Sequence, residues 1–243
     1  MTIRSLRAAM SFLTVLPVAN ADGSSGERLG RAYFPAIGAL IGLAAGATFA
    51  ILSAVTSPLL AAACAVAFLC VLTGAIHIDG LGDAADGLLG GGDPSRRLEV
   101  MRDPRLGTFG VTAIVVVLLL DVAALSSMSP ARGLAALVVG GALSRLATLS
   151  VIASVPYVRS TGLGVAAWDA RHRGLDLVLG SATALVAAAI DWRRALIALP
   201  LVGLTALAVA ALARRRLGGA TGDVCGATAE LCQLATLLVF AVR

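Results

Sequence analysis

The sequence predicts an all-α protein, built as a polytopic bundle of transmembrane helices. Of its 243 residues, 58% are hydrophobic and only 14% are charged, and the mean hydropathy is +0.93. A soluble domain of this size needs more polar surface than this, so the bilayer must form part of the solvent. The chain also lacks a polar stretch long enough for a separate soluble domain. We therefore expect one integral membrane catalytic domain over residues 1–243.

The N-terminal segment, at about residues 3–18, is expected to form an amphipathic interfacial helix. Arg4 and Arg7 precede an apolar run that is too short to cross a bilayer, and no small-residue cleavage site follows it. We therefore interpret this segment as a membrane-surface helix rather than a removed signal peptide.

A helix needs roughly 20 mostly apolar residues to cross the hydrocarbon core. About seven segments meet this condition, with six or eight as alternatives if the N-terminal helix inserts or the short fifth segment does not. The expected spans are about 34–55, 59–76, 108–127, 133–155, 175–189, 195–213 and 224–242.

The basic residues indicate the orientation of these spans. All 19 are arginines; fourteen fall on one side of the arrangement, four on the other, and Arg145 lies within the fourth span. The positive-inside rule makes the richer side cytoplasmic. That side also carries the longer connections, at about 77–107, 156–174 and 214–223, where we expect the active-site loops. A net charge of +5 then reflects orientation and anionic lipid headgroups, so we expect a lipid bilayer and no nucleic acid as partner.

The most informative stretch is His77-Ile-Asp79-Gly-Leu-Gly-Asp83-Ala-Ala-Asp86-Gly87, directly after the second span. On a helix, its three aspartates occupy one face across two turns. No arginine lies between Leu72 and Asp93 to offset their charge, whereas Mg²⁺ prefers carboxylate oxygens, water and substrate phosphates. We predict a Mg²⁺ site at Asp79, Asp83 and Asp86. The alternative is a solvated helix start whose acidic residues complement the helix dipole.

Several residues further along the chain are candidates for binding phosphate or substrate. The forks of Arg102 and Arg105 suit phosphate oxygens, although both could simply anchor the chain at the cytoplasmic surface. Arg145 lies inside a span, where a charge is costly, so it is either functional or paired with Asp121 or Glu230. The full set of candidates is Arg102, Asp103, Arg105, Thr108, Ser144, Arg145, Arg159, Asp223 and Glu230.

Acidic metal ligands and arginines on one membrane face indicate phosphoryl transfer. A base is needed for the attacking hydroxyl, and His77 is the candidate that titrates near neutral pH. We therefore assign catalytic roles to His77, Asp79 and Asp83.

Five motifs in register resemble the cobalamin synthase family, also called the adenosylcobinamide-GDP ribazoletransferases. They are Phe34-Pro-Ala-Ile-Gly38-Ala-Leu-Ile-Gly42, the His77–Gly87 stretch, the segment from Met101 to Gly110, Ser144-Arg145, and the segment from Thr221 to Glu230. Ala75 stands where this family is expected to have Gly, and Gly82 where Ala is usual.

The resemblance implies a multi-pass enzyme of the bacterial cytoplasmic (inner) membrane, with its active site facing the cytoplasm. Such an enzyme joins adenosylcobinamide-GDP to α-ribazole or its 5′-phosphate, releases GMP and requires Mg²⁺. Whether it forms a homo-oligomer or a complex with other cobalamin-assembly enzymes is left open.

Two other functions deserve comparison. A CDP-alcohol phosphotransferase also clusters aspartates beside a membrane helix, but its pattern carries Ala-Arg soon after the first aspartate pair, which Asp79-Gly-Leu-Gly-Asp83 lacks.

A transporter could use Arg145 and Glu230 as intramembrane charges. It would need polar residues through to the far side, whereas the motifs here gather on one face.

Overall fold

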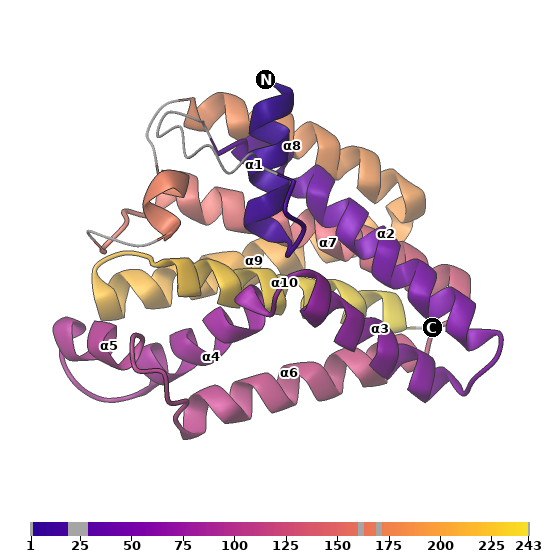
Figure 1. The fold of residues 1–243 in the computed structure, drawn as a ribbon, viewed down its shortest axis with the longest axis horizontal. Helices are drawn as coiled ribbons and strands as arrows, with labels where there is room; N and C mark the ends of the chain where they lie inside the picture. Colours follow the sequence, from indigo (N-terminus) through magenta and orange to yellow (C-terminus); the bar gives the residue numbers. More distant parts are fainter. Residues whose placement is uncertain (1, 19–28, 160–162, 169–171, 243) are drawn as a thin grey trace.

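The computed structural model describes residues 2–18, 29–159, 163–168 and 172–242, and these are almost entirely helical (Figure 1). Arg28, Arg171, Arg243 and part of the expected 156–174 loop lie outside the described residues. The α-helices are α1 (Ile3–Leu13), α2 (Phe34–Ser53), α3 (Pro58–Leu72), α4 (Ile76–Leu89), α5 (Pro94–Val100), α6 (Thr108–Ser126), α7 (Pro130–Ser154), α8 (Arg173–Ala188), α9 (Trp192–Leu217) and α10 (Gly222–Ala241). Three short 3₁₀ turns accompany them, η1 (Arg31–Tyr33), η2 (Leu163–Trp168) and η3 (Ala189–Asp191).

Helix α7 forms the centre of the bundle. In its most apolar window 83% of the residues are buried, and it packs against α2, α8, α9 and α10. Gly38 of α2 and Gly141 of α7 bring their backbones into direct contact, because a Cβ atom on either would clash with the carbonyl of the other. Small residues at helix crossings are how helices pack tightly in lipid, where the hydrophobic effect between helices is weak. The predicted all-α polytopic bundle is confirmed.

The number of candidate spans is lower than the seven expected. The described residues contain five helical stretches long and apolar enough to cross a membrane, or six if the bent α3–α4 pair counts as one span. Residues 175–189 and 195–213, expected as separate spans, belong to one helical stretch, Arg173–Leu217. At 1.5 Å per residue this stretch is about twice the thickness of a hydrocarbon core. Its backbone departs from helical geometry at Asp191, with φ −140° and ψ 76°.

The break between α3 and α4 determines how the acidic stretch is presented. Gly74 and Ala75 both adopt left-handed backbone angles, with φ +62° and +57°, and the two helices meet at 88°. The left-handed region suits glycine and strains a residue with a Cβ atom, which explains why glycine is expected where this chain has Ala75. The bend turns α4 into the bundle, against α10 and α6.

Helix α1 is amphipathic, as predicted, but ends at Leu13 rather than near residue 18. Its buried residues Ala9 and Leu13 face the bundle, and the Val15 amide donates to the Leu72 carbonyl at 2.9 Å. The N-terminal segment is therefore attached to the end of α3, next to the bend.

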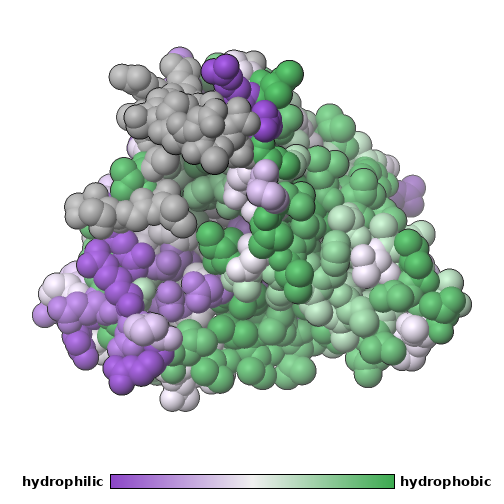
Figure 2. Space-filling model, in the orientation of Figure 1, coloured by the Kyte–Doolittle hydropathy of each residue, from purple (hydrophilic) through white to green (hydrophobic). Residues whose placement is uncertain are grey.

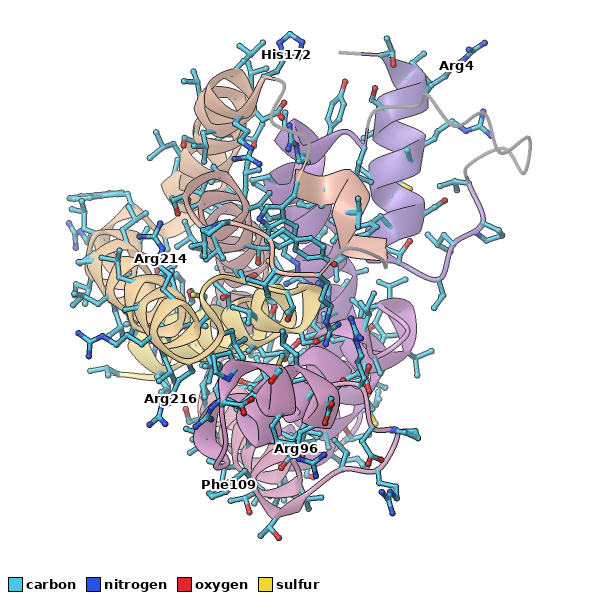
Figure 3. All side chains as sticks on the ribbon, turned by 90° about the vertical axis from the view of Figure 1, so that its left-hand side faces the viewer. Arg4, Arg96, Phe109, His172, Arg214 and Arg216 are labelled. Carbon is cyan, nitrogen blue, oxygen red and sulfur yellow. The ribbon has the colours of Figure 1, made fainter. Side chains whose placement is uncertain are left out.

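Polar residues gather at one end of the molecule, over α5 and the helix ends beside it, and most of the remaining visible surface is apolar (Figure 2). Looking onto that end, Arg4, Arg96, Arg214 and Arg216 project from α1, α5 and α9 (Figure 3). The expected loops are more helical than the sequence suggested, since residues 77–107 contain α4 and α5, and the connection expected at 214–223 is reduced to residues 218–221.

Candidate active site

The site forms where α4 crosses the start of α10. A Cβ atom on Gly80 would lie 3.1 Å from the Asp223 Cα, and one on Gly226 would lie 2.9 Å from the His77 carbonyl oxygen. The glycines therefore allow the two backbones to touch. This crossing joins residues more than 140 positions apart and brings Asp223 beside the aspartates of α4.

Asp79, Asp83 and Asp223 share one electrostatic environment, because the charges of Asp223 and Asp79 both act on Asp83. Arg159 enters the same environment from the segment after α7. Its guanidinium pairs with Asp223 at 2.7 Å and donates to the Met101 carbonyl at 3.2 Å. The main-chain pairing of Tyr157 with Ala220 holds this segment against the start of α10. The guanidinium of Arg159 therefore shares this environment with the carboxylates of Asp79, Asp83 and Asp223.

The three aspartates of α4 differ in exposure. Asp79 is exposed, Asp83 is half-buried and Asp86 is buried. The carboxylate of Asp86 accepts hydrogen bonds from the Gly107 and Gly110 amides, at 2.7 and 2.9 Å. It therefore caps the N-terminus of α6, whose first amides have no partner within the helix. Glycine is suited to positions 107 and 110 because a Cβ atom there would collide with this carboxylate.

The aspartates provide oxygen ligands of the kind that a hard cation prefers. Among the residues that the structure describes, no group of three or more His, Cys, Asp or Glu side chains is already arranged to hold a metal ion. Because both oxygens of Asp86 are engaged with α6, the pair best placed for Mg²⁺ is Asp79 and Asp83, with Asp223 beside them. The Mg²⁺ site stays a prediction.

A cavity of about 270 Å³ opens beside these residues. Its polar lining residues include His77, Asp79, Arg159 and Asp223, together with Thr148 and Cys225. His77 is only 7% exposed, and its Nδ1 has no hydrogen-bond partner among the described residues. An unpartnered buried ring nitrogen on a residue that lines the cavity makes His77 the candidate base.

Aromatic and aliphatic side chains make up the rest of the lining. Tyr157 and Trp168 pack with ring centroids 4.6 Å apart, and Phe12 of α1 stacks on Phe34 of α2 at 5.8 Å. The aromatic residues of this lining were not among the residues predicted from the sequence. One feature of the sequence could have indicated them. The chain has only four Tyr and Trp residues, and two of these, Tyr157 and Trp168, lie in one expected cytoplasmic connection.

Arg145 and Glu230 lie apart from this cavity. With Asp121 and Gln233 they line a separate internal void of about 10 Å³, close to the space of one water molecule. Arg145 donates to the Ser144 hydroxyl at 2.9 Å and to Gln233 Oε1 at 3.2 Å. Among the described residues Arg145 makes no salt bridge with Asp121 or Glu230, the pairing that the structural alternative required, and its hydrogen-bond partners are the uncharged Ser144 and Gln233.

The remaining candidates lie at the rim of the molecule. Arg105 is bound to Asp103 at 2.8 Å, and this contact holds the pKa of Asp103 well below its ordinary range. Arg102 and Thr108 are exposed. The structure therefore brings together His77, Asp79, Asp83, Arg159 and Asp223, whereas Ser144, Arg145 and Glu230 lie in the bundle interior and Arg102–Thr108 at its edge.

The apolar helical bundle places this chain in the class of polytopic membrane proteins, and acidic and basic side chains line one of its cavities. Residues 5–241 match the family model described as cobalamin-5-phosphate synthase, and the chain belongs to this family. It is 41% identical to the adenosylcobinamide-GDP ribazoletransferase of Stutzerimonas stutzeri, over 98% of each chain. It is 37% identical to the protein of that name from Bradyrhizobium diazoefficiens, over 98% of this chain and 94% of the relative. No solved structure matches significantly.

Proposed function

We propose that this chain joins adenosylcobinamide-GDP to α-ribazole or its 5′-phosphate and releases GMP, in the cytoplasmic membrane of a bacterium. The family membership and the names of the relatives support this activity. The single observation that carries the assignment of the site is the crossing at Gly80 and Gly226, which sets Asp223 and its partner Arg159 beside the α4 aspartates. Asp223 lies in the first turn of α10, shortly after the three arginines Arg214, Arg215 and Arg216 in the last turn of α9, which favours a cytoplasmic site.

The reaction breaks a phosphoanhydride bond of the diphosphate and forms a phosphodiester bond. A ribose hydroxyl oxygen of the acceptor forms a bond to the phosphorus on the cobinamide arm, and the bond from that phosphorus to the GMP oxygen breaks. The hydroxyl proton passes to a base. His77 is the candidate, because its side chain lines the cavity and its Nδ1 has no hydrogen-bond partner among the described residues. GMP leaves with the electron pair of the broken bond.

The protein must balance the charge of the diphosphate during this step. Arg159 can donate two parallel hydrogen bonds to phosphate oxygens by sharing or exchanging its contact with Asp223. Asp79 and Asp83 would hold Mg²⁺ against the same diphosphate. When bound, Mg²⁺ would stabilise negative charge on the phosphate oxygens as the GMP oxygen departs.

The test uses the full chain purified in detergent or nanodiscs. It is incubated with adenosylcobinamide-GDP and α-ribazole phosphate, with Mg²⁺ or with a chelator, and GMP is measured by chromatography. We expect GMP in amounts equal to the corrinoid product, only when both substrates and Mg²⁺ are present. Absence of GMP from protein that remains folded contradicts the proposal.

A further inference from the structure

The residues that line the cavity are of two chemical kinds. Asp79, Arg159 and Asp223 are charged. Phe12 and Phe34 are apolar, as are further lining residues, among them Ile76, Ile152, Ala167 and Trp168. A ligand that fits this lining must itself carry both an apolar part and a polar or charged part.

The size of the cavity limits which part of the substrates it can hold. Its volume of about 270 Å³ lies just below the range of roughly 300–1,000 Å³ found for pockets that enclose drug-sized ligands. A nucleoside fits a space of this size. A corrin macrocycle with its peripheral amide side chains is far larger, so the corrinoid must lie outside the cavity.

Two nucleosides take part in the proposed reaction, guanosine and ribazole, and their bases differ in polarity. Guanine carries donors and acceptors around its edge, which lose free energy if buried without partners. The base of ribazole is a methylated benzimidazole with no hydrogen-bond donor. Among the lining residues, the Trp168 indole N–H already donates to the Val155 carbonyl at 2.9 Å, and the Thr148 hydroxyl donates to the Ser144 carbonyl at 3.0 Å. The apolar lining residues therefore offer ring and alkyl surfaces rather than free donors.

We infer that the apolar lining residues of the cavity form the subsite for the base of the acceptor nucleoside, with Trp168, Ile152 and Phe12 contacting the benzimidazole. The inference rests on the proposed function and adds which substrate occupies the cavity. The ribose then extends toward His77 and Asp79, and a 5′-phosphate, where present, toward Arg159. Guanosine and the corrinoid bind outside the cavity, on the far side of the aspartates.

A matched pair of variants tests the subsite kinetically. Ile152 lines the cavity, whereas Ile41 is equally buried at the α2–α7 contact and does not. Ile152→Ala is expected to raise the KM for α-ribazole at least about tenfold, the effect of removing methylene contacts from an apolar pocket. Its KM for adenosylcobinamide-GDP should stay within twofold, and Ile41→Ala should change neither KM, although both variants lose a similar amount of thermal stability.

Binding without turnover provides a second, independent measurement. The chain has two tryptophans, and Trp192 is 58% exposed on α9, so the Trp192→Phe protein reports Trp168 alone. Titration with α-ribazole, excited at the red edge of the tryptophan band, should change this emission in a saturable way. Guanosine at the same concentrations should not, and the Trp168→Phe protein should give no response to either nucleoside.

The outcomes separate this inference from the proposed function. If wild-type protein forms GMP but Ile152→Ala raises the KM for adenosylcobinamide-GDP instead, or guanosine quenches Trp168 as strongly as ribazole, the subsite assignment is overturned and the activity stands. If no GMP forms under any condition while ribazole still quenches Trp168, the activity fails and the subsite stands. Ribazole that leaves Trp168 emission unchanged overturns the subsite.

Discussion

Arg159 and Asp223 form a 2.7 Å ion pair that connects the segment after α7 to the first turn of α10 at the mouth of the cavity. Both side chains are largely shielded from water, at 14% and 18% exposure, so the pair is screened less than a surface salt bridge. The charge of Arg159 also acts on Asp83. The pair is therefore suited to exchange one carboxylate contact for a phosphate contact.

Replacing Arg159 with Ala should lower kcat/KM by about 10²–10³-fold, the usual cost of losing a donor to developing charge. Arg159→Lys keeps the charge but not the planar fork, and should recover only part of the activity. The measurement is GMP release at subsaturating adenosylcobinamide-GDP. Because the two residues act as a pair, Arg159→Ala combined with Asp223→Asn should cost less than the product of the single effects. Full additivity would show that the two act independently.

Asp86 and Asp79 should respond differently to removal of the carboxylate. Asp86→Ala leaves the Gly107 and Gly110 amides without their acceptor and should reduce the free energy of unfolding by about 1–3 kcal/mol. Asp79→Ala, at an exposed position, should leave stability unchanged and abolish activity. Thermal unfolding in one detergent compares them. An Asp86→Ala protein that is as stable as wild type but inactive would favour a metal-ligand role for Asp86.

The glycines at the crossing of α4 and α10 should not tolerate replacement by a residue with a side chain. Gly226→Ala introduces a Cβ atom 2.9 Å from the His77 carbonyl, and the resulting displacement should cost about 1–3 kcal/mol and reduce GMP release. Gly203 on α9 is the matched control, because a Cβ atom there meets nothing within 4 Å. Gly203→Ala should preserve activity and gain up to about 1 kcal/mol of stability from helix propensity. Equal behaviour of the two variants would contradict the close crossing.

Replacing Ala75 is predicted to raise the stability of the fold rather than lower it. Its φ of +57° is strained for a residue with a Cβ atom, so Ala75→Gly should stabilise the fold by about 0.5–1 kcal/mol, after allowing for the greater freedom of glycine in the unfolded chain. The measurement is thermal unfolding, with activity retained. A loss of stability would mean that the bend between α3 and α4 is not left-handed at this residue.

Local and compositional signals predicted much of this arrangement. Apolar length identified α2, α6, α7 and α10, and the spacing of Asp79, Asp83 and Asp86 correctly indicated one helix. The different surroundings of those aspartates could not be predicted, because they arise when the Gly74–Ala75 bend turns α4 inward. The partners of Arg159 and Arg145 could not be predicted either. Only tertiary packing places Arg159 against Asp223 and Arg145 against Gln233.

The central claim is that Asp79, at the α4–α10 crossing, belongs to the active site of a Mg²⁺-dependent transferase. The most direct measurement is GMP release by purified wild-type and Asp79→Asn proteins, with adenosylcobinamide-GDP, α-ribazole phosphate and Mg²⁺ all at saturation. The account predicts GMP from the wild type and a rate at least about 10²-fold lower from a folded Asp79→Asn protein. GMP release by Asp79→Asn at the wild-type rate would contradict it.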